Sequence, residues 1–211
     1  MGAVVSTVTL PDERDPGLRK LSYYVACTLD GFIGDPHGDA SSMFQFIDEE
    51  YAAFMNSEYP ETIPTAFRES FGLAGVPNKR FDTVIQGLGS YRLALDAGVV
   101  SPYAHLREIV ATRSLAESPD PNVELVAGDL VARVRELKAE DGPLGIWLCG
   151  GAQVAGQLAD EIDELVIKSY PQVYGSGMPM FGAGFGIRDF ALEDVRSFGN
   201  GVVVRTYTRK R

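Results

Sequence analysis

Residues 144–159 read LGIWLCGGAQVAGQLA, and residues 162–181 read IDELVIKSYPQVYGSGMPMF. The first run begins with apolar residues, which is typical of a strand buried on both faces. Gly150 and Gly151 end this strand, and the next residues place apolar side chains on one side of a short helix over 152–159. Glycines let a ligand approach the backbone closely, and the free N–H groups of a first helical turn attract an anion. We therefore expect an anionic ligand to bind at this pair of glycines.

The second run adds a strand over 165–170 that Pro171 stops, followed by a Gly-x-Gly at Gly175 and Gly177. The ordered set of strand, Gly-Gly-Ala, short helix, Asp-Glu-Leu strand, Pro, Gly-x-Gly and Phe resembles the C-terminal half of the dihydrofolate-reductase-like fold. More closely, it is similar to the branch that contains the riboflavin-biosynthesis reductase, the C-terminal domain of a bacterial bifunctional deaminase-reductase. The resemblance extends over residues 20–209, nearly the whole chain.

The rest of the chain alternates strands with helices. Periodicity predicts a helix that begins near Asp48 and another over 130–139, and it predicts strands over 21–29, 82–86, 107–111 and 123–126. A hairpin over 190–198 and 202–208 turns at Gly199-Asn200-Gly201. The predicted fold is a dihydrofolate-reductase-like three-layer α/β sandwich. Its central sheet is mainly parallel, with helices on both faces and a C-terminal antiparallel hairpin.

The chain length of 211 residues suffices for one sizeable core. We expect residues 20–211 to form a single reductase domain, and residues 1–19 to form either a tail or a strand added at a sheet edge. Residues 59–80 contain three prolines and interrupt the compact family pattern, which predicts an insertion. Such a segment is a lid, an oligomer contact or decoration.

The composition excludes several classes of function. A formal charge of −10 argues against nucleic-acid binding, which requires a basic face. Cys27 and Cys149 lie in apolar runs and are expected to be buried, reduced thiols. His37 and His105 are far apart, with no Cys or His at ligand spacing, so we expect no metal site. The absence of a long apolar run or a signal-peptide pattern predicts a cytoplasmic protein without a membrane partner.

The strand over 21–29 ends at Asp30-Gly31, a pair that by itself indicates a turn. The family resemblance implies that this pair leads into a mobile loop beside the nicotinamide and the substrate. It also implies that Ala26 and Ile33 contact the cofactor.

Two further strand ends are candidates for cofactor binding, because ligands bind at the carboxyl ends of parallel strands. A Gly-x-Gly after the 82–86 strand is by itself only a turn. Its position resembles the family's strand-to-helix turn over the cofactor phosphates, although Leu88 replaces the family arginine. The next strand is followed by Thr112 and Arg113, where the family holds the adenosine ribose and, in many members, its 2′-phosphate. Arg113 is equally typical of a solvated surface residue.

The resemblance implies NADPH as the cofactor, with its pyrophosphate against the Gly-Gly-Ala turn. The implied cofactor contacts are Ala26, Ile33, Gly87, Gly89, Ser90, Tyr91, Thr112, Arg113, Gly150, Gly151, Ala152 and Gln153. It further implies a cis peptide bond between Gly150 and Gly151, and a homodimer. The apolar run Val202-Val203-Val204 is consistent with a strand whose face is covered by a second copy.

Glu50 and Phe54 are spaced like the acid and the aromatic residue that line the substrate pocket of dihydrofolate reductases. Acidic residues are also favoured at any helix start. The Leu-Pro-Trp that normally precedes this pair is replaced by MFQF at 43–46. Asp30 and Glu50, ahead of Asp48, are the candidate catalytic proton donors.

The predicted function is an NADPH-dependent reductase of the 5-amino-6-(5-phosphoribosylamino)uracil type, which transfers a hydride to a small heterocyclic or carbonyl/imine substrate. The alternatives are a non-catalytic nucleotide- or ligand-binding protein on the same fold, which the loss of the arginine at Leu88 favours, and a dihydrofolate reductase. Tyr24 stands where the riboflavin reductase has a lysine near the substrate. Residues 35–50 contain no cation except His37, and Lys79 and Arg80 compensate only if the insertion folds over the pocket. The natural substrate therefore stays open.

Overall fold

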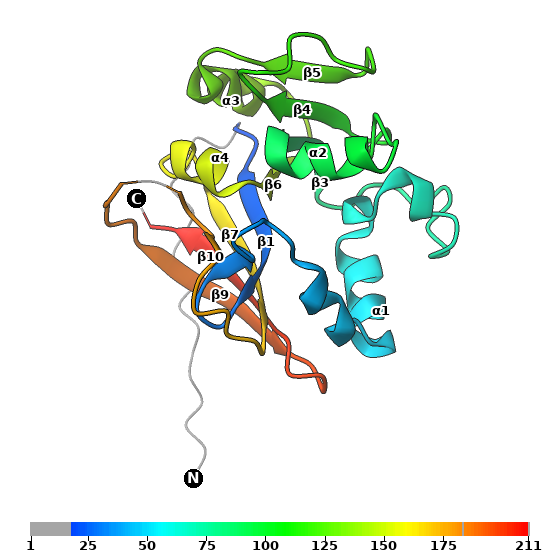
Figure 1. The fold of residues 1–211 in the computed structure, drawn as a ribbon, viewed down its shortest axis with the longest axis vertical. Coiled ribbons are helices and arrows are strands. Elements are labelled where there is room, and N and C mark those ends of the chain that lie inside the picture. Colours follow the sequence, from blue (N-terminus) through cyan, green and yellow to red (C-terminus); the bar gives the residue numbers. More distant parts are fainter. Residues whose placement is uncertain (1–17, 183, 211) are drawn as a thin grey trace.

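The computed structural model describes residues 18–182 and 184–210. A central sheet of eight strands has the order β5-β4-β3-β6-β1-β7-β10-β9 (Figure 1). The strands are β1 (Leu21–Thr28), β3 (Phe81–Gly87), β4 (Arg107–Ala111), β5 (Val123–Val126), β6 (Gly145–Gly150), β7 (Glu164–Tyr170), β9 (Phe190–Ser197) and β10 (Val203–Arg209). The strands from β5 to β7 in this order run parallel, whereas β10 pairs antiparallel with both β7 and β9.

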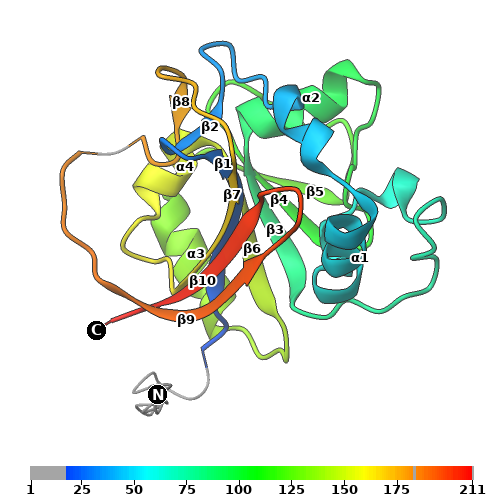
Figure 2. The ribbon, with the colours of Figure 1, turned by 90° about the horizontal axis from the view of Figure 1, so that it is seen from below.

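Helices cover both faces of the sheet, as Figure 2 shows. One face carries α1 (Glu49–Glu58) and α2 (Leu88–Asp96), and the other carries α3 (Leu130–Ala139) and α4 (Ala152–Gln157). Short 3-10 helices precede and follow α1 at Ser41–Phe46 (η1), Pro60–Thr62 (η2) and Thr65–Phe67 (η3). The predicted fold class, a mainly parallel sheet with helices on both faces and a C-terminal antiparallel hairpin, is confirmed.

The sheet is buried on both faces because successive side chains of a strand point to opposite sides. In β1, Tyr23 and Val25 enter the core under α3 and α4, together with Leu158 of the loop after α4. Tyr24, between them, enters the core on the α1 side, together with Tyr51 of that helix. A continuous apolar run such as the one that forms β6 supplies apolar side chains to the cores on both faces of the sheet.

The helices and strands begin and end close to the residues predicted from the sequence. β4, β5 and α3 begin and end at the predicted residues, and the other strands and α4 differ by one or two residues at an end. Asp48 is the N-cap of α1 and accepts a hydrogen bond from Tyr51 N. A second, two-stranded sheet of β2 (Phe32–Gly34) and β8 (Met178–Pro179) has no counterpart among the predicted elements. Of the tail or edge strand predicted over 1–19, residues 1–17 lie outside the described residues.

The segment over 59–80 is a packed unit at the amino end of β3. Glu61 is fully buried and accepts hydrogen bonds from the backbone N–H groups of Arg80 and Phe81, each at 2.7 Å. Arg68 is also buried and donates to the backbone carbonyls of Pro60 and Val76. Because the segment is fixed at the amino end of the sheet, its described contacts do not place it over the carboxyl ends of the strands.

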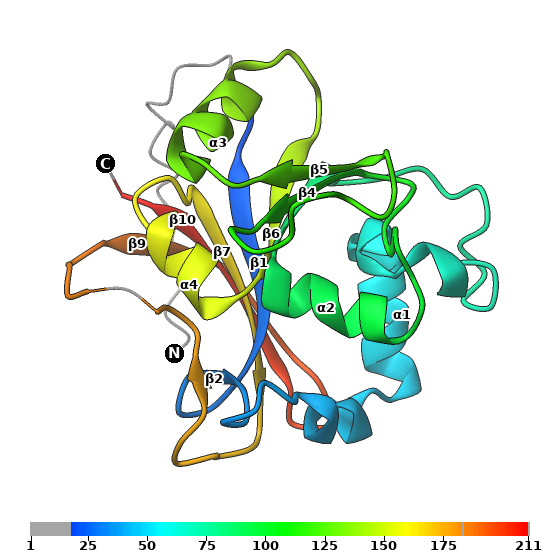
Figure 3. The same ribbon diagram turned by 45° about the horizontal axis from the view of Figure 1, so that its top comes forward.

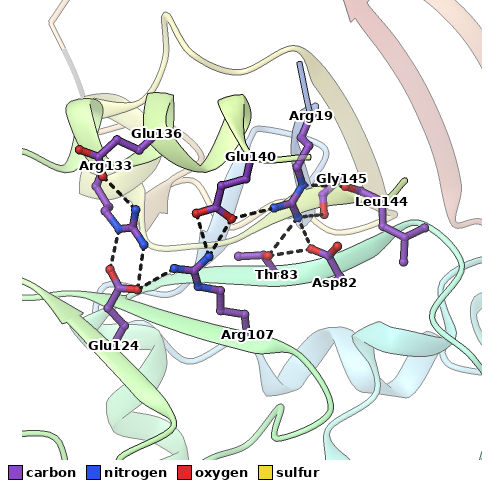
Figure 4. A network of polar contacts seen from close by, with 10 residues as sticks. All are labelled: Arg19, Asp82, Thr83, Arg107, Glu124, Arg133, Glu136, Glu140, Leu144 and Gly145. Atoms are coloured by element: carbon purple, nitrogen blue, oxygen red, sulfur yellow. Dashed lines mark hydrogen bonds and ion pairs between the residues drawn. The ribbon is translucent and has the colours of Figure 1, made fainter. Parts of the chain in front are cut away.

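A chain of ion pairs ties α3 to the amino ends of the strands (Figure 4). Acidic and basic side chains alternate along it. The carboxylates of Glu140 and Glu124 each pair with two arginines. The pairs are Asp82–Arg19, Arg19–Glu140, Glu140–Arg107, Arg107–Glu124, Glu124–Arg133 and Arg133–Glu136. Arg19 is buried, and its pairs are therefore less screened than those on the surface. This network braces the end of the sheet opposite the carboxyl edge.

Candidate functional site

The parallel strands end together along one edge of the sheet. Gly87, the last residue of β3, is the register partner of Ala111, the last residue of β4. Gln86 is the register partner of Gly150 at the end of β6. The first turns of α2 and α4 lie beside each other at this edge, as Figure 3 shows. The edge therefore has the geometry in which α/β proteins bind ligands.

Three glycines at this edge pack backbone against backbone. A Cβ on Gly87 would lie 3.0 Å from Val154 Cγ2 and 3.5 Å from Gly150 O, and a Cβ on Gly151 would lie 3.6 Å from Gly87 Cα. Gly150 has a φ of 148° and Gly151 a φ of 99°, values that residues with a side chain rarely adopt. Close approach and backbone conformation together require glycine here.

The predicted cis peptide bond between Gly150 and Gly151 is wrong, because every described peptide bond is trans. The chain instead turns from β6 into α4 through the positive φ angles of both glycines. Two residues free of a Cβ give a sufficient change of direction without a cis bond.

A groove of about 730 Å³ opens at the same edge, a volume typical of small-molecule sites. Its walls are the loops that follow β4 and β5, the start of α2, and α4. Arg113 is the only charged residue among those that line it. Within the described part of the chain, no carboxylate or hydrogen-bond acceptor pairs with its guanidinium group. Thr112 Oγ1 accepts from the backbone N–H groups of Ser114 and Leu115, which fixes the turn that presents Arg113.

The structure brings most of the predicted cofactor contacts to this edge. Thr112, Arg113 and Gln153 line the groove itself. Ser90 Oγ lies 3.9 Å from the position that a Cβ on Gly150 would take. Gly89 is exposed in the first turn of α2, and Ala152 is the first residue of α4.

Tyr91 is the exception among these residues. Its side chain is fully buried against Val110 and Val123, and its hydroxyl donates to the carbonyl oxygen of Val100. The tyrosine thus anchors α2 to the sheet and leaves no surface for a ligand.

Ala26 and Ile33 lie further along the edge, toward β7. Ala26 is half-buried in β1, on the α1 face of the sheet. Ile33 is half-buried in β2 and packs on the opposite core. A ligand that contacts both would extend from the groove across the end of β1.

Asp30 holds together the turns after β1 and β7. Its carboxylate accepts hydrogen bonds from Thr28 Oγ1 at 2.5 Å, from Gly175 N at 2.8 Å and from Tyr174 N at 3.2 Å. The bond from the Thr28 hydroxyl, followed by those from the two backbone amides, lowers the pKa of this carboxyl. Asp30 is exposed and ionised, and it orders the loop next to the predicted nicotinamide position.

Glu50 lies away from the groove. It is exposed in the first turn of α1, and a Cβ on Gly199 would come within 3.8 Å of its Oε2. Its carboxylate is therefore beside the turn between β9 and β10.

Lys79 and Arg80 do not reach the carboxyl edge. Both pair with Glu58 at 2.9 Å, near the amino end of β3. Hydrogen bonds from these two side chains lower the pKa of Glu58 to about 2. Lys79 and Arg80 are therefore held by Glu58 away from the groove, and they supply no cation to a ligand bound there.

Lys168 is a residue that sequence reasoning missed. It lies in β7, where its register partner on β1 is Ala26, and its Nζ is 3.9 Å from the centroid of the Tyr24 ring. The signal was the lysine that directly follows the apolar run Leu165-Val166-Ile167. That signal becomes informative only once β7 is known to lie beside β1.

In residues 18–182 and 184–210, no helix is long and apolar enough to cross a membrane. No group of three or more His, Cys, Asp or Glu side chains gathers there in a way that could hold a metal ion.

The fold and the glycine-built turn at its carboxyl edge define an α/β protein with the dihydrofolate-reductase-like fold. Within this class, the family model described as the RibD C-terminal domain matches residues 90–204, more than half of the chain. The chain belongs to the RibD C-terminal domain family.

Individual relatives agree with this assignment. An uncharacterized protein of Bacillus subtilis (strain 168), YwjB, is 28% identical over 186 residues, which covers 87% of this chain and 95% of YwjB. A crystal structure of a candidate riboflavin biosynthesis protein from Shewanella sp. PV-4 has a TM-score of 0.66 at 24% identity, and the match covers 91% of this chain and 99% of that one.

Two named enzymes share the fold at lower identity. The deaminase/5-amino-6-(5-phosphoribosylamino)uracil reductase of Thermotoga maritima has a TM-score of 0.61 at 18% identity, covering 92% of this chain and 57% of that one. This chain thus spans little more than half of the bifunctional protein. Dihydrofolate reductase from Enterococcus faecalis, complexed with NADP(H) and an inhibitor named RAB-propyl, has a TM-score of 0.56 at 14% identity, covering 91% of this chain and 97% of that one.

Proposed function

We propose that this chain is an NADPH-dependent oxidoreductase that transfers a hydride to a carbonyl or imine carbon of a small heterocyclic substrate. The groove at the carboxyl edge carries the proposal, because it presents one unpaired cation, Arg113, beside a glycine-built turn. Membership of the RibD C-terminal domain family supports a reductase rather than a protein that only binds.

The residues of the groove fit a phosphorylated dinucleotide. Arg113 would hold the 2′-phosphate of NADPH, since a guanidinium group pairs well with phosphate oxygens. The pyrophosphate would lie against Gly150 and Gly151, where no Cβ blocks the backbone, and near the N–H groups of the first turn of α2. Leu88, which replaces the family arginine, lines the groove as an apolar wall.

When bound, NADPH supplies the hydride, and the protein supplies orientation and exclusion of water. The small sheet of β2 and β8 lies beside the end of β1 and would shield the reacting atoms. The backbone approaches closely here: a Cβ on Gly177, the residue just before β8, would overlap the carbonyl oxygen of Gly34 in β2. Asp30 fixes the turns on either side of this sheet.

The first substrate to test is 5-amino-6-(5-phosphoribosylamino)uracil, which the name of the Thermotoga relative includes. The cations that sequence reasoning considered for its phosphate, Lys79 and Arg80, are paired with Glu58 at the other end of β3. For this reason we propose the reductase chemistry for carbonyl and imine compounds as a class. The exposed position of Glu50 does not favour the dihydrofolate reductase alternative.

The test combines cofactor binding with turnover. Calorimetric titration should show that wild type binds NADPH and that Gly151→Val loses this binding, because a valine cannot adopt a φ of 99° without strain. Gly184→Val is the matched control, since Gly184 has open space around its Cα and lies away from the groove. NADPH oxidation is then followed with the uracil compound and with a panel of aldehydes, ketones and imines.

Complementation of a riboflavin auxotroph that lacks the reductase would assign the uracil substrate. Binding with no turnover of any compound would instead support the non-catalytic alternative. No NADPH binding by wild type would refute the proposal.

We further propose that the protein is a homodimer in the cytoplasm, with residues 20–211 as one domain and 59–80 as an insertion. The valine run that suggested a dimer is covered by the chain itself, because Val202 and Val204 are buried in the core under α1. Support comes instead from the edge strand β9, where Leu192 and Val195 are about half exposed at 55% and 50%. The free thiols of Cys27 and Cys149 fit a reducing compartment.

A further inference from the structure

Lys168 is a cation without an acidic partner. It faces the α1 side of the sheet, because Val166 and Tyr170, two residues away in each direction along β7, belong to the core on that side. The Tyr24 ring lies under its ammonium group, with 3.9 Å between Nζ and the ring centroid. Among the described residues, no carboxylate, carbonyl or hydroxyl accepts a hydrogen bond from Nζ.

The groups that surround Lys168 leave its charge uncompensated. On the two neighbouring strands its register partners are Ala26 of β1 and Val204 of β10, both apolar. The titratable groups near it are Tyr24 and Cys27 of β1 and Cys149 of β6. From α1, the core on this side receives Tyr51, Phe54 and Met55, whereas Glu50 lies at the β9–β10 turn.

Burial lowers the pKa of the Lys168 ammonium to about 8. Burial also raises the pKa of the Cys149 thiol to about 11, so this neighbour is neutral. Near pH 7 Lys168 is therefore protonated, but it releases its proton more readily than an ordinary lysine.

Lys168 is also next to the proposed reaction centre. Its register partner Ala26 is a predicted cofactor contact on the strand that leads into the loop beside the predicted nicotinamide position, and Cys149 immediately precedes the Gly150-Gly151 turn. Ala26, Cys149 and Lys168 each keep part of their surface exposed to solvent.

Hydride transfer to a carbonyl or imine carbon leaves an electron pair on oxygen or nitrogen, which must take up a proton. Asp30 is ionised and accepts three hydrogen bonds, so it is a poor donor. Glu50 is exposed beside the β9–β10 turn. The hydroxyl of Tyr24 donates to Met55 Sδ at 2.8 Å, and burial raises its pKa.

We propose that Lys168 is the proton donor of this reductase, an inference that rests on the proposed function. As the new C–H bond forms from the hydride, the π electrons of the C=O or C=N bond move to the heteroatom. That atom takes a proton from Lys168 Nζ. The substrate thus gains a hydride and a proton, NADP⁺ is left, and the neutral amine recovers its proton from water.

A direct test measures the protonation of Lys168 without turnover. Protein labelled with ¹³C at lysine Cε is titrated by NMR with saturating NADP⁺, and the Lys168 signal is the one absent from Lys168→Met. We expect a midpoint near pH 8, well below the roughly 10.4 of an ordinary lysine. A midpoint at the ordinary value overturns the proposal, even if no compound is reduced.

Kinetics supply the second test, with 5-amino-6-(5-phosphoribosylamino)uracil or the first compound of the panel that wild type reduces. A proton donor acts in its protonated form, so wild-type kcat should be constant below about pH 8 and fall tenfold per pH unit above it. Lys168→Met should lower kcat at least about 100-fold and remove this alkaline limb. Lys168→Arg should keep the charge but restore little of the rate, because a guanidinium group does not release its proton.

NADPH affinity separates the two proposals. Lys168→Met and the control Lys20→Met, an exposed lysine just before β1, should both bind NADPH like wild type. If wild type does not bind NADPH, the proposed function fails. If binding and turnover are normal but Lys168→Met keeps the rate and the alkaline limb, Lys168 is not the donor. Loss of the limb in Asp30→Asn or Glu50→Gln instead would assign the role to that acid.

Discussion

The ammonium of Lys168 lies 3.9 Å from the centroid of the Tyr24 ring, and an aromatic face rather than a carboxylate is its only described partner. A cation–π contact of this kind contributes about 0.5–2 kcal/mol, which is less than the cost of removing an ammonium group from water. The chain therefore keeps a charge that destabilises the fold at neutral pH. Such a residue is expected where function, rather than stability, maintains it.

Lys168→Met should stabilise the protein at neutral pH. Because burial lowers the pKa of Lys168 to about 8, the unfolded chain binds more protons than the folded chain between about pH 8 and the ordinary lysine value of roughly 10.4. Wild-type stability should then rise over this window, and the advantage of the mutant should shrink. Thermal melts at pH 7 should show a Tm a few degrees above wild type, since about 1 kcal/mol corresponds to roughly 2–4 °C in a chain of this size.

Lys20→Met is the control for this measurement, because Lys20 is exposed and close to the same strand. A mutant Tm that is lower than wild type at pH 7, or a difference that does not vary with pH, would mean that Lys168 is not a buried charge.

Arg113→Ala should discriminate between the two nicotinamide cofactors. A charge-assisted hydrogen bond to the 2′-phosphate is worth about 1.5–3 kcal/mol, so the affinity for NADPH should fall about ten- to a hundredfold. The affinity for NADH, which has no such phosphate, should change little. Calorimetry with both cofactors measures this.

Arg135→Ala provides the matched control, because Arg135 is exposed on α3 and pairs with Glu161 away from the groove. Equal losses for NADPH and NADH in Arg113→Ala would show that Arg113 has a structural role.

Local sequence patterns predicted most of the fold. β4, β5 and α3 are short apolar or amphipathic segments bounded by turn residues, and their bounds follow from that pattern alone. The small sheet of β2 and β8 did not follow, because its strands have three and two residues and lie far apart in the chain. Their pairing depends on the close approach of Gly34 and Gly177, which no local pattern encodes.

The same distinction holds for the candidate site: local sequence predicts the positions of some of its residues but not of others. Arg113 and Gly150 were predictable because a residue that follows a buried parallel strand must lie at the carboxyl edge. The burial of Tyr91 depends on the direction in which its side chain leaves α2. The position of Lys168 depends on which strands are neighbours, since β7 and β1 are separated in sequence by most of the fold. Side-chain direction and lateral strand order are tertiary properties.

Asp30→Asn should loosen the turn that follows β7. The asparagine loses the negative charge that receives hydrogen bonds from Thr28, Gly175 and Tyr174. Because the folded-state pKa of Asp30 is lowered, its contribution to stability is present above the unfolded value of about 3.9 and is lost as the pH falls through the folded value.

Hydrogen exchange of the amides of Tyr174 and Gly175 is the measurement for Asp30. At pH 7 it should be faster in Asp30→Asn than in wild type, and limited proteolysis should cut this turn more readily. Asp39→Asn, in the exposed loop after β2, is a control that should leave these amides unchanged. Equal exchange rates in wild type and Asp30→Asn would show that Asp30 does not order this turn.

The last prediction concerns the homodimer and asks which surface forms it. Val195 is half exposed on β9, and β9 is the edge of the sheet, so an unpaired strand and apolar side chains coincide there. Phe67 is exposed to a similar degree in the 59–80 segment, the alternative oligomer contact. Light scattering at micromolar concentration should give a dimer mass for wild type and for Phe67→Glu, and a monomer mass for Val195→Glu, which places a charge in the interface. A monomer mass for Phe67→Glu and a dimer mass for Val195→Glu would instead place the interface at the 59–80 segment. A monomer mass for wild type would refute the dimer.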